Sequence, residues 1–478
     1  MKLNNNTLAS TVNVNLTNVP KPNVTGFVAQ EVLLVAKGSA AVSYTAGLYE
    51  SITSVTGVEN DFGAGSPIAL MVKQAKKSAF SKLDIYVLPD EAGDVAEVRD
   101  TTLTGTPANG VITVKSDDLS IPVSITTADT LETAAGKIVE AVNEIGDFQF
   151  IASNTADNLV FSAKWAGADT AEIDLSIDYG VTGITGALSV STAGSGIISY
   201  TTAINAVKDM RHTAIVPQTK DQVSIDAWEQ SIIDKIANNM EFKGGQVYFV
   251  DSSINLEDAK TLGTYNRNYK YINYLSVKGD NGKVVLASDF EVAANYASTI
   301  SEYAEANPAQ SYNNITLEGL SAGKNLYDHN ERNTLLQNGI ATLYADNGVV
   351  KIQDAITTYH PSRDDEPGYR YVSDFQKRLN MARRIYATFN SEKWRGSVIA
   401  KEGDYLNASA NAKTLADYKA EMYKLIDGFT ADAFVFDAEA NKAGVTVEQD
   451  VNNASRVNVD FKAIITKNGR IINVDVKF

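Results

Sequence analysis

The feature that most constrains the fold is an alternation of short apolar runs with amphipathic segments between residues 198 and 358. The apolar runs read HTAIV, QVYFV and YINYLSV, and each has the length and uniform apolarity of a buried strand. Between the first two lies SIDAWEQSIIDKIANNM, whose apolar residues have helical spacing. A later helix is predicted to begin after Ser288, because Glu291 completes a capping box. Repeated strand–helix–strand units predict a mostly parallel sheet with helices on both faces.

The preceding residues divide into two regions. Residues 23–88 carry the apolar runs EVLLVAKG and KLDIYVL around the amphipathic segment SPIALMVKQAKKSA. Residues 89–197 carry short alternating runs such as GVITVKS and SIPVSITT, with one helical segment, TLETAAGKIVEAVNEI. Such spacing predicts a small β-rich domain, and its place between α/β segments indicates an insertion. The expected parts are an N-terminal arm, the first part of the core, the insert, the α/β core domain and a C-terminal inner domain with a terminal hairpin: 1–22, 23–88, 89–197, 198–360 and 361–478.

Charge and cysteine content exclude several function classes. The net charge is −16, and residues 90–200 hold 17 acidic against 4 basic side chains, whereas residues 451–478 hold 5 basic against 2 acidic ones. The acidic region argues against nucleic-acid binding and suits an outer, solvent-facing insert. The chain contains no cysteine, so it has no disulfide, thiolate metal site or thiol nucleophile. The N-terminal residues lack signal-peptide regions and no long apolar window occurs, so we expect no membrane insertion.

Apolar residues alternate with polar ones near both ends of the chain. Residues 11–19 read TVNVNLTNV and precede Pro20-Lys21-Pro22, a stiff linker. Residues 457–478 alternate on both sides of Lys467-Asn468-Gly469, which predicts a hairpin. A lone strand behind a linker cannot satisfy its own backbone, so residues 11–19 either pair with another segment or form a frayed terminus. The alternating residues that could take part in such pairing are Val12, Val14, Leu16, Val457, Val459, Phe461, Ile472, Val474, Val476 and Phe478.

One catalytic motif matches by letter. Gly319–Gly323 reads G-x-S-x-G, the nucleophile elbow of serine hydrolases, with Ser321 as the nucleophile. An elbow opens directly into a helix, whereas the segment that follows, KNLYDHNERN, is polar and turn-prone. The three histidines, His212, His329 and His360, show no metal-binding spacing. We therefore expect no catalytic residue, no metal and no cofactor, and we keep a serine hydrolase using Ser321 as an alternative.

Two stretches carry a family resemblance. Residues 317–359 contain the blocks E-x-N-x-L-L-x-N-G-I and G-x-V-x-I, followed by I-T-T-Y. These blocks resemble the signature of the contractile-tail sheath proteins of myovirus-type bacteriophages, although Gln353 stands where family members often have arginine. FGAGSPIALMVKQAKK, residues 62–77, is similar to an early family segment, and residues 89–197 resemble the family's insert. The signature positions are Glu331, Asn333, Leu335, Leu336, Asn338, Gly339, Ile340, Thr357, Thr358 and Tyr359.

The resemblance implies a multi-domain α/β fold with a subtilisin-like core that lacks the catalytic triad. It also implies terminal strands that are exchanged between subunits, with the linker Pro20-Lys21-Pro22 and the loop 436–455 as pivots. It implies stacked hexameric rings that surround a tail tube and contract to drive the tube through the host envelope. The implied partners are other sheath subunits, the tail tube protein, and the baseplate and tail-terminator proteins, with no nucleic acid. The implied location is the virion, after assembly in the host bacterial cytoplasm. A non-contractile surface-layer or adhesin subunit is a further alternative.

Overall fold

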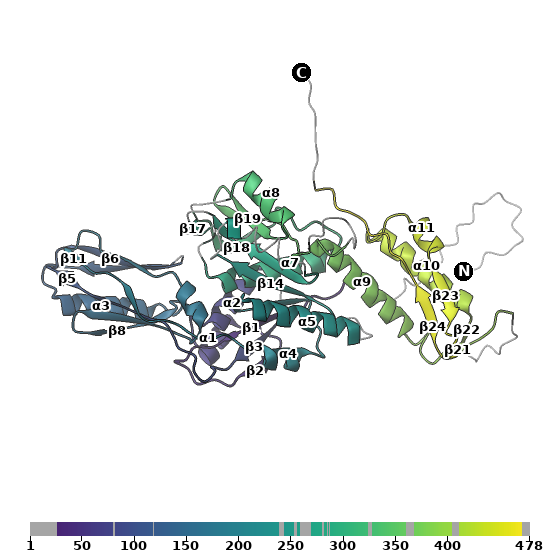
Figure 1. The fold of residues 1–478 in the computed structure, drawn as a ribbon, viewed down its shortest axis with the longest axis horizontal. Helices are drawn as coiled ribbons and strands as arrows, with labels where there is room; N and C mark the ends of the chain where they lie inside the picture. The colour runs from purple at the N-terminus through teal and green to yellow at the C-terminus, as the bar shows by residue number, and fades with distance from the viewer. Residues whose placement is uncertain are drawn as a thin grey trace, which may run out of the picture.

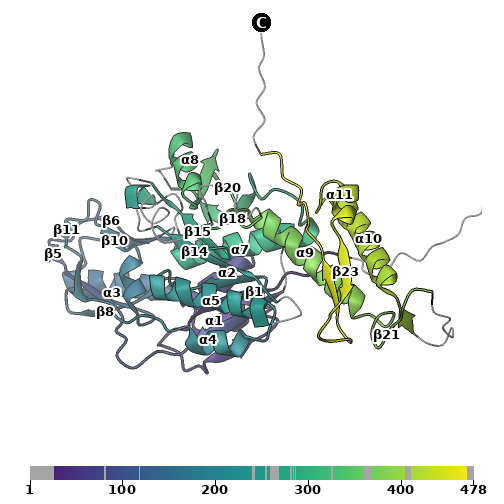
Figure 2. The same cartoon turned by 45° about the vertical axis from the view of Figure 1, so that its right-hand side comes forward.

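The structure, a computed structural model, covers most of the chain. It describes residues 26–470 apart from 80–81, 118, 239–242, 253–255, 259–268, 280–281, 284, 286, 324–326, 360–367 and 404–410. Three parts follow one another along the long axis: a β-rich part, a central sheet with helices, and a helical part with a hairpin (Figures 1 and 2). None of the helices described combines the length and apolarity that crossing a bilayer requires.

A mixed sheet forms the centre of the molecule, with nine strands in the described residues. Its strand order is β18-β20-β19-β15-β14-β13-β1-β3-β2. The strands from β3 to β19 are parallel, while β2, β20 and β18 each run antiparallel to a neighbour. The mixed α/β class predicted from the sequence is confirmed. The strands are β1 (Val32–Lys37), β2 (Gly47–Tyr49), β3 (Leu83–Leu88), β13 (Ala214–Pro217), β14 (Gln246–Asp251), β15 (Ile272–Ser276), β18 (Thr316–Ser321), β19 (Ala341–Asp346) and β20 (Val349–Asp354).

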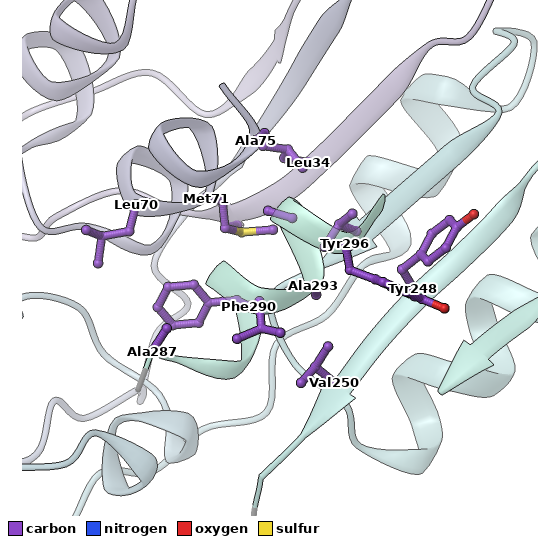
Figure 3. Close-up of a cluster of buried hydrophobic side chains, with 14 of the residues drawn as sticks. Leu34, Leu70, Met71, Ala75, Tyr248, Val250, Ala287, Phe290, Ala293 and Tyr296 are labelled. Atoms are coloured by element: carbon purple, nitrogen blue, oxygen red, sulfur yellow. The ribbon is translucent and has the colours of Figure 1, made fainter. Parts of the chain in front are cut away.

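Helices cover the sheet, which explains why every residue of β1, β3 and β14 is buried. Helices α2 and α7 pack on each other and on β1 and β14. Figure 3 shows this core: Met71 from α2 lies between Leu34 of β1 and Phe290 of α7, and Tyr248 of β14 meets Tyr296 edge to face. The helices of this part are α1 (Val55–Phe62), α2 (Pro67–Ala75), α4 (Thr201–Val207), α5 (Gln222–Asn238), α7 (Asp289–Ala306) and α8 (His329–Gln337).

The region between β3 and α4 is the β-rich part, which lies at one end of the molecule (Figure 1). It contains antiparallel sheets of order β12-β4-β9-β8, β10-β6-β7 and β11-β5, together with the helix α3 (Leu131–Glu144). Thr130, the first residue of the predicted helical segment, is the N-cap of α3. The strands are β4 (Val98–Thr102), β5 (Thr104–Gly105), β6 (Gly110–Ser116), β7 (Leu119–Ile125), β8 (Phe150–Thr155), β9 (Asn158–Ala163), β10 (Ser176–Asp178), β11 (Ile184–Thr185) and β12 (Ser189–Thr192).

The β-rich part is joined tightly to the central sheet. Gly65 adopts φ +75°, and a Cβ there would lie 2.7 Å from the carbonyl oxygens of Gly146 and Phe148. Glycine is therefore required where the chain turns into α2 beneath the insert. The Lys164 ammonium donates to the Gly146 carbonyl at 2.8 Å, and Trp165 packs edge to face on Phe290 of α7, 6.0 Å between ring centroids. The two parts thus share one apolar core.

The C-terminal region lies at the opposite end from the insert (Figures 1 and 2). Two long helices, α9 and α10, occur where the sequence predicts amphipathic helices. Thr414 and Asp417 form a capping box at the start of α10. The elements are α9 (Val372–Phe389), β21 (Val398–Ile399), β22 (Ala412–Lys413), α10 (Leu415–Ala431), α11 (Ala438–Ala443), β23 (Thr446–Gln449) and β24 (Val457–Asp460). The remaining short strands of the chain are β16 (Lys278–Gly279) and β17 (Gly282–Lys283).

Candidate functional site in the C-terminal region

Within the described residues, β23 and β24 form a sheet of two strands only. They are antiparallel, with Thr446 opposite Asp460 and Gln449 opposite Val457. The outer edge of each strand pairs with no other strand in that part of the chain. Unpaired edges present backbone donors and acceptors to which a further strand can add.

The structure describes only part of the predicted hairpin. The sequence places a turn at Lys467-Asn468-Gly469, which would pair residues 457–465 with those that follow it, but residues 471–478 lie outside the described residues. In the described residues β24 pairs with β23, a partner that the sequence did not predict, and residues 461–470 contain no strand beyond a single bridge between Ile465 and Val435. The reason is tertiary, because β23 packs against α10 and presents its edge to β24.

An apolar groove lies beside this open sheet. Val457, Val459 and Phe461 alternate with polar neighbours, so their side chains share one face. They line a groove of about 390 Å³ together with side chains from α9, α10 and the loop between them. Trp394 and Tyr418 pack at 4.6 Å between ring centroids on its wall. The full lining is Ile385, Phe389, Trp394, Tyr418, Met422, Val457, Val459 and Phe461.

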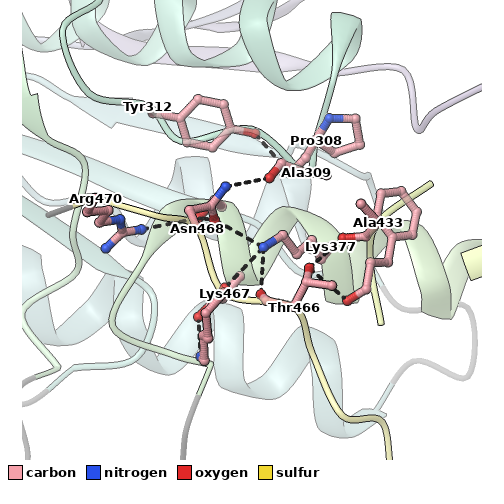
Figure 4. Close-up of polar contacts among 12 residues, drawn as sticks. Pro308, Ala309, Tyr312, Lys377, Ala433, Thr466, Lys467, Asn468 and Arg470 are labelled. Carbon is pink, nitrogen blue, oxygen red and sulfur yellow. Dashed lines mark hydrogen bonds and ion pairs between the residues drawn. The ribbon is translucent and has the colours of Figure 1, made fainter. Parts of the chain in front are cut away.

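The segment from Ile464 to Arg470, here called the strap, lies against α9 and is held by polar contacts (Figure 4). The ammonium of Lys377, whose side chain is 1% exposed, donates to the Thr466 carbonyl at 2.8 Å and to Asn468 Oδ1 at 3.1 Å. The Asn468 amide donates to the Ala309 carbonyl at 2.7 Å. The Thr466 backbone N–H donates to the Phe434 carbonyl at 3.1 Å. The strap therefore ties α9, the loop after α7 and the end of α10 together.

Two basic side chains complete the attachment of the strap. Lys467 forms an ion pair with Asp374 at 2.7 Å, and Asp374 is buried. The Arg470 guanidinium lies 3.2 Å from the centre of the Tyr371 ring and 3.6 Å from a carboxylate oxygen of Asp354. Burial raises the pKa of the Asp354 carboxyl, and the charge of Arg470 opposes that rise. Lys467 and Arg470 of the strap therefore each lie beside a carboxylate from outside the strap.

Burial lowers the pKa of the Lys377 ammonium, the central cation of this network, and the neighbouring Asp374 carboxylate opposes that shift. Sequence reasoning did not single out Lys377. The available signal is a polar stripe on the predicted helix, because Ser373, Lys377 and Asn380 recur at helical spacing and all three are buried.

The structure describes some of the residues predicted to pair between subunits. Val457 and Val459 lie in β24, and Phe461 follows it on the same face. The structure brings these three together in the groove. The others lie outside the described residues, namely Val12, Val14, Leu16, Ile472, Val474, Val476 and Phe478.

The first signature block builds α8 and the entry to β19. Asp328 and Glu331 form a capping box at the helix N-terminus, so KNLYDHNERN does lead into a helix, contrary to the prediction from its polarity. Leu335 and Ile340 are fully buried, and Gly339 has φ +75° at the turn between them. The other members of the block, Asn333, Leu336 and Asn338, belong to the same helix and its C-cap.

The second signature block holds β20 and the following segment to the sheet. Thr357 and Thr358 are fully buried, and the Thr357 hydroxyl donates to the Tyr369 carbonyl at 2.8 Å. Tyr359 packs edge to face on Tyr369. Gln353 accepts a hydrogen bond from Arg332 at 2.8 Å, where an arginine would place two cations together. The signature residues therefore act in folding rather than in chemistry.

Within the described residues, Ser321 is not placed beside the groups that a serine hydrolase needs. Ser321 ends β18 and is exposed, and α8 begins only at His329, so no elbow forms. Within the described residues, no hydrogen bond joins Ser321 to a histidine. His212 contacts Asp84 at 3.1 Å but is 0% exposed, and His360 lies outside the described residues. No group of side chains in the described part could hold a metal ion.

Comparison with known proteins adds to this geometry. No family model and no curated protein matches the chain. Among solved structures, the sheath tail protein Lin1278 from Listeria innocua matches with 13% identity and a TM-score of 0.50, over 93% of this chain and 94% of that one. The chain has a tail-sheath fold. The sheath tail protein DSY3957 from Desulfitobacterium hafniense also matches, with 12% identity and a TM-score of 0.48, over 95% of this chain and 100% of that one.

A third match is the helical sheath of the anti-feeding prophage in its contracted state. Its identity is 10% and its TM-score 0.47, with 98% of each chain covered. At such low identities, what this chain shares with Lin1278 is the fold.

Proposed function

We propose that this chain is the subunit of a contractile sheath of a myovirus-type bacteriophage. Its copies polymerise as stacked hexameric rings around a tail tube and contract to drive the tube through the host envelope. The observation that carries the proposal is the tail-sheath fold, matched over 93% of this chain and 94% of Lin1278. The partners on this proposal are other copies of the chain, the tube protein, and the baseplate and tail-terminator proteins. The site of action is the virion, after assembly in the bacterial cytoplasm.

The open sheet supplies a means of joining subunits. On this proposal, residues 11–19 of a neighbouring copy add to the edge of the β23–β24 sheet. Val12, Val14 and Leu16 then share one face, as alternate residues of a strand do, and they extend the apolar face that lines the groove. Each backbone hydrogen bond contributes about 1 kcal/mol net, and each buried valine or leucine adds roughly 1.5–3 kcal/mol. The last strand, residues 472–478, is the other candidate donor.

Electron microscopy of the purified protein tests the function directly. Tubular polymers with sixfold rings are expected in negative stain. A two-dimensional lattice would favour the surface-layer alternative, and monodisperse monomers at all concentrations would contradict the sheath proposal. An esterase activity that Ser321→Ala abolishes would favour the hydrolase.

Substitutions in the arm test the strand exchange. Val12→Asp and Val14→Asp place charge on the apolar face and should abolish sedimentable polymer. Asn13→Asp and Asn15→Asp make the same charge change on the opposite face and serve as the matched control. Deletion of residues 1–20 should likewise leave a folded protein that no longer polymerises. Unchanged polymerisation of the deletion variant would rule out the arm as the connector.

A further inference from the structure

A second cavity lies at the carboxyl edge of the parallel strands. The chain passes from β1 to β3 on one side and continues from β13 to β14 on the other, so the direction of the connections reverses beside β1. Ligand sites of open α/β sheets lie at the carboxyl edge at such a point. The cavity holds about 420 Å³, within the range of small-ligand pockets. The lining residues that matter most are Asp169, Glu172, Lys220, Asp251, Asp289 and Phe290.

The cavity carries more negative than positive charge. Lys220 is its one cation among the described lining residues, and it pairs with Glu172 at 2.6 Å, with Asp251 at 3.3 Å and with Asp289. Asp169 and Asp221 add two further carboxylates. The Oδ2 atom of Asp169 accepts hydrogen bonds from Trp165 and Gln218, while its Oδ1 atom has no donor in the described part of the chain. The Oδ1 atom of Asp289 likewise has none there. The described lining of the cavity therefore contains five carboxylates and one ammonium.

Burial raises the pKa values of two of these carboxyl groups. Burial raises the pKa of Asp169. Burial also raises the pKa of Glu172, and the charges of Asp289 and Asp251 add to the rise while Lys220 opposes it. A second cation at this place would relieve the mutual repulsion of the carboxylates.

The mouth of the cavity is apolar and exposed. Ile197 lines it with 65% of its surface exposed, and Val223, next to the lining residue Gln222, is 70% exposed. Ile173 and Phe290 continue the apolar wall inward. The Glu172 carboxylate lies at the mouth with its side chain 44% exposed, while the Asp251 and Asp289 side chains are 5% and 11% exposed. Such a site fits a cation on an alkyl stem, because the stem packs along the apolar wall while the head reaches the carboxylates.

We propose that this cavity is a socket for a lysine or arginine side chain from a second copy of this chain. The inference rests on the proposed self-assembly, which supplies that copy. Exposed basic side chains occur on it, namely Lys82, Lys393, Lys424 and Arg456, which are each about half exposed or more. Each is paired with a carboxylate of its own chain and would exchange that partner for the socket. The cation lies beside Glu172 and Asp289, and the stem lies against Ile197 and Phe290. The contact joins the bodies of neighbouring subunits, away from the β23–β24 sheet.

Charge reversal at the mouth tests the socket. Glu172→Lys should reduce the sedimentable fraction at least ten-fold, and Glu172→Gln should reduce it less. Glu132→Lys changes an exposed glutamate of α3 in the same way and should polymerise like the wild type. Ile197→Ser should weaken assembly, whereas Val181→Ser, at another exposed position, should not. Circular dichroism of every variant checks the fold. Equal effects of Glu172→Lys and Glu132→Lys would overturn the proposal.

A small probe separates the socket from the polymer. N-acetyl-lysine methylamide should bind the unassembled full chain, and neutral N-acetyl-norleucine methylamide should not. Glu172→Gln should weaken the binding of the lysine probe several-fold in calorimetry. If the wild-type chain never polymerises, the sheath proposal fails while probe binding still decides the socket. Absence of binding by the lysine probe, or equal binding of both probes, would overturn it.

Carbodiimide cross-linking of mixed isotope-labelled and unlabelled copies identifies the donor. A cross-link between Glu172 of one copy and a lysine of another supports the proposal. The intramolecular link from Glu172 to Lys220 is the internal positive control, since the two side chains are already paired. The intramolecular link without any intermolecular one in assembled polymer would overturn a lysine donor. In that case, unaltered assembly of Arg456→Gln and the other exposed arginine variants would overturn an arginine donor as well.

Discussion

Replacement of Lys377 by methionine should release the strap from α9. Methionine keeps most of the stem but removes the ammonium that donates to the Thr466 carbonyl and to Asn468 Oδ1. Asn468 Oδ1 still accepts a hydrogen bond from the Ser373 hydroxyl at 3.2 Å, and Asp374 keeps its ion pair with Lys467. The groups that lose a partner are therefore the Thr466 carbonyl and the Oδ1 atom of Asp374, which lies 3.5 Å from the Lys377 ammonium.

The magnitude follows from two opposing effects. A hydrogen bond from a charged donor contributes roughly 1.5–3 kcal/mol, so two such bonds contribute roughly 3–6 kcal/mol. Burial of the Lys377 ammonium opposes this, as its lowered pKa indicates. We therefore expect Lys377→Met to destabilise the attached strap by on the order of 2 kcal/mol, which increases its detached population about 30-fold.

Hydrogen exchange measures the change directly. The backbone N–H of Thr466 donates to the Phe434 carbonyl, so its exchange reports detachment of the strap. It should exchange about 30-fold faster in Lys377→Met than in the wild type. Lys467→Met removes the same charge from a side chain that is 56% exposed, and the buried Asp374 keeps Lys377 at 3.5 Å, so the rate should change by less than about five-fold. Equal rates in the two variants, or slower exchange in Lys377→Met, would refute the reasoning.

Two buried ionisable side chains give further predictions. Burial raises the pKa of Glu229 from 4.5 to about 7, so stability should fall by on the order of 3 kcal/mol as the pH rises from 4.5 to 7; denaturant unfolding should show a shallower fall for Glu229→Gln. Burial lowers the pKa of Lys235 from 10.5 to about 8. The destabilisation that comes from burying its charged ammonium is therefore present below pH 8 and is lost by pH 10.5. Lys235→Met should therefore stabilise the protein by about 2 kcal/mol at pH 7 and by little at pH 10.5, and a loss of stability at pH 7 would contradict this.

The parallel strands could be predicted because their sequences are apolar throughout, which indicates burial on both faces. VLLVAK, LDIYVL and QVYFVD are apolar throughout and become β1, β3 and β14, in which every residue is buried. A strand covered on both faces needs no polar alternation, and turn residues bound each run. Capping boxes were equally informative, since Ser288 and Glu291 do begin α7.

The partner of β24 could not be predicted in this way. β23 is the short run TVEQ, in which one residue is partly buried and three are exposed, so no apolar pattern marks it. Its position comes from packing against α10, a contact between residues distant in sequence. The same holds for α8, whose polar sequence was misinterpreted because the Asp328 cap compensates for weak apolar spacing.

The structure also changes where an assembled subunit can pivot. The segment 436–455 was expected to be a flexible loop, but it contains α11 and β23, and Asn441 of α11 is fully buried, with its side-chain amide bonded to the Phe436 carbonyl. The strap then fixes the chain to α9 as far as Arg470. A movement that preserves these contacts must carry α9, α10 and the β23–β24 sheet together with the central sheet and its helices. If subunits shift during contraction while strands stay paired, the pivot therefore lies outside residues 436–470.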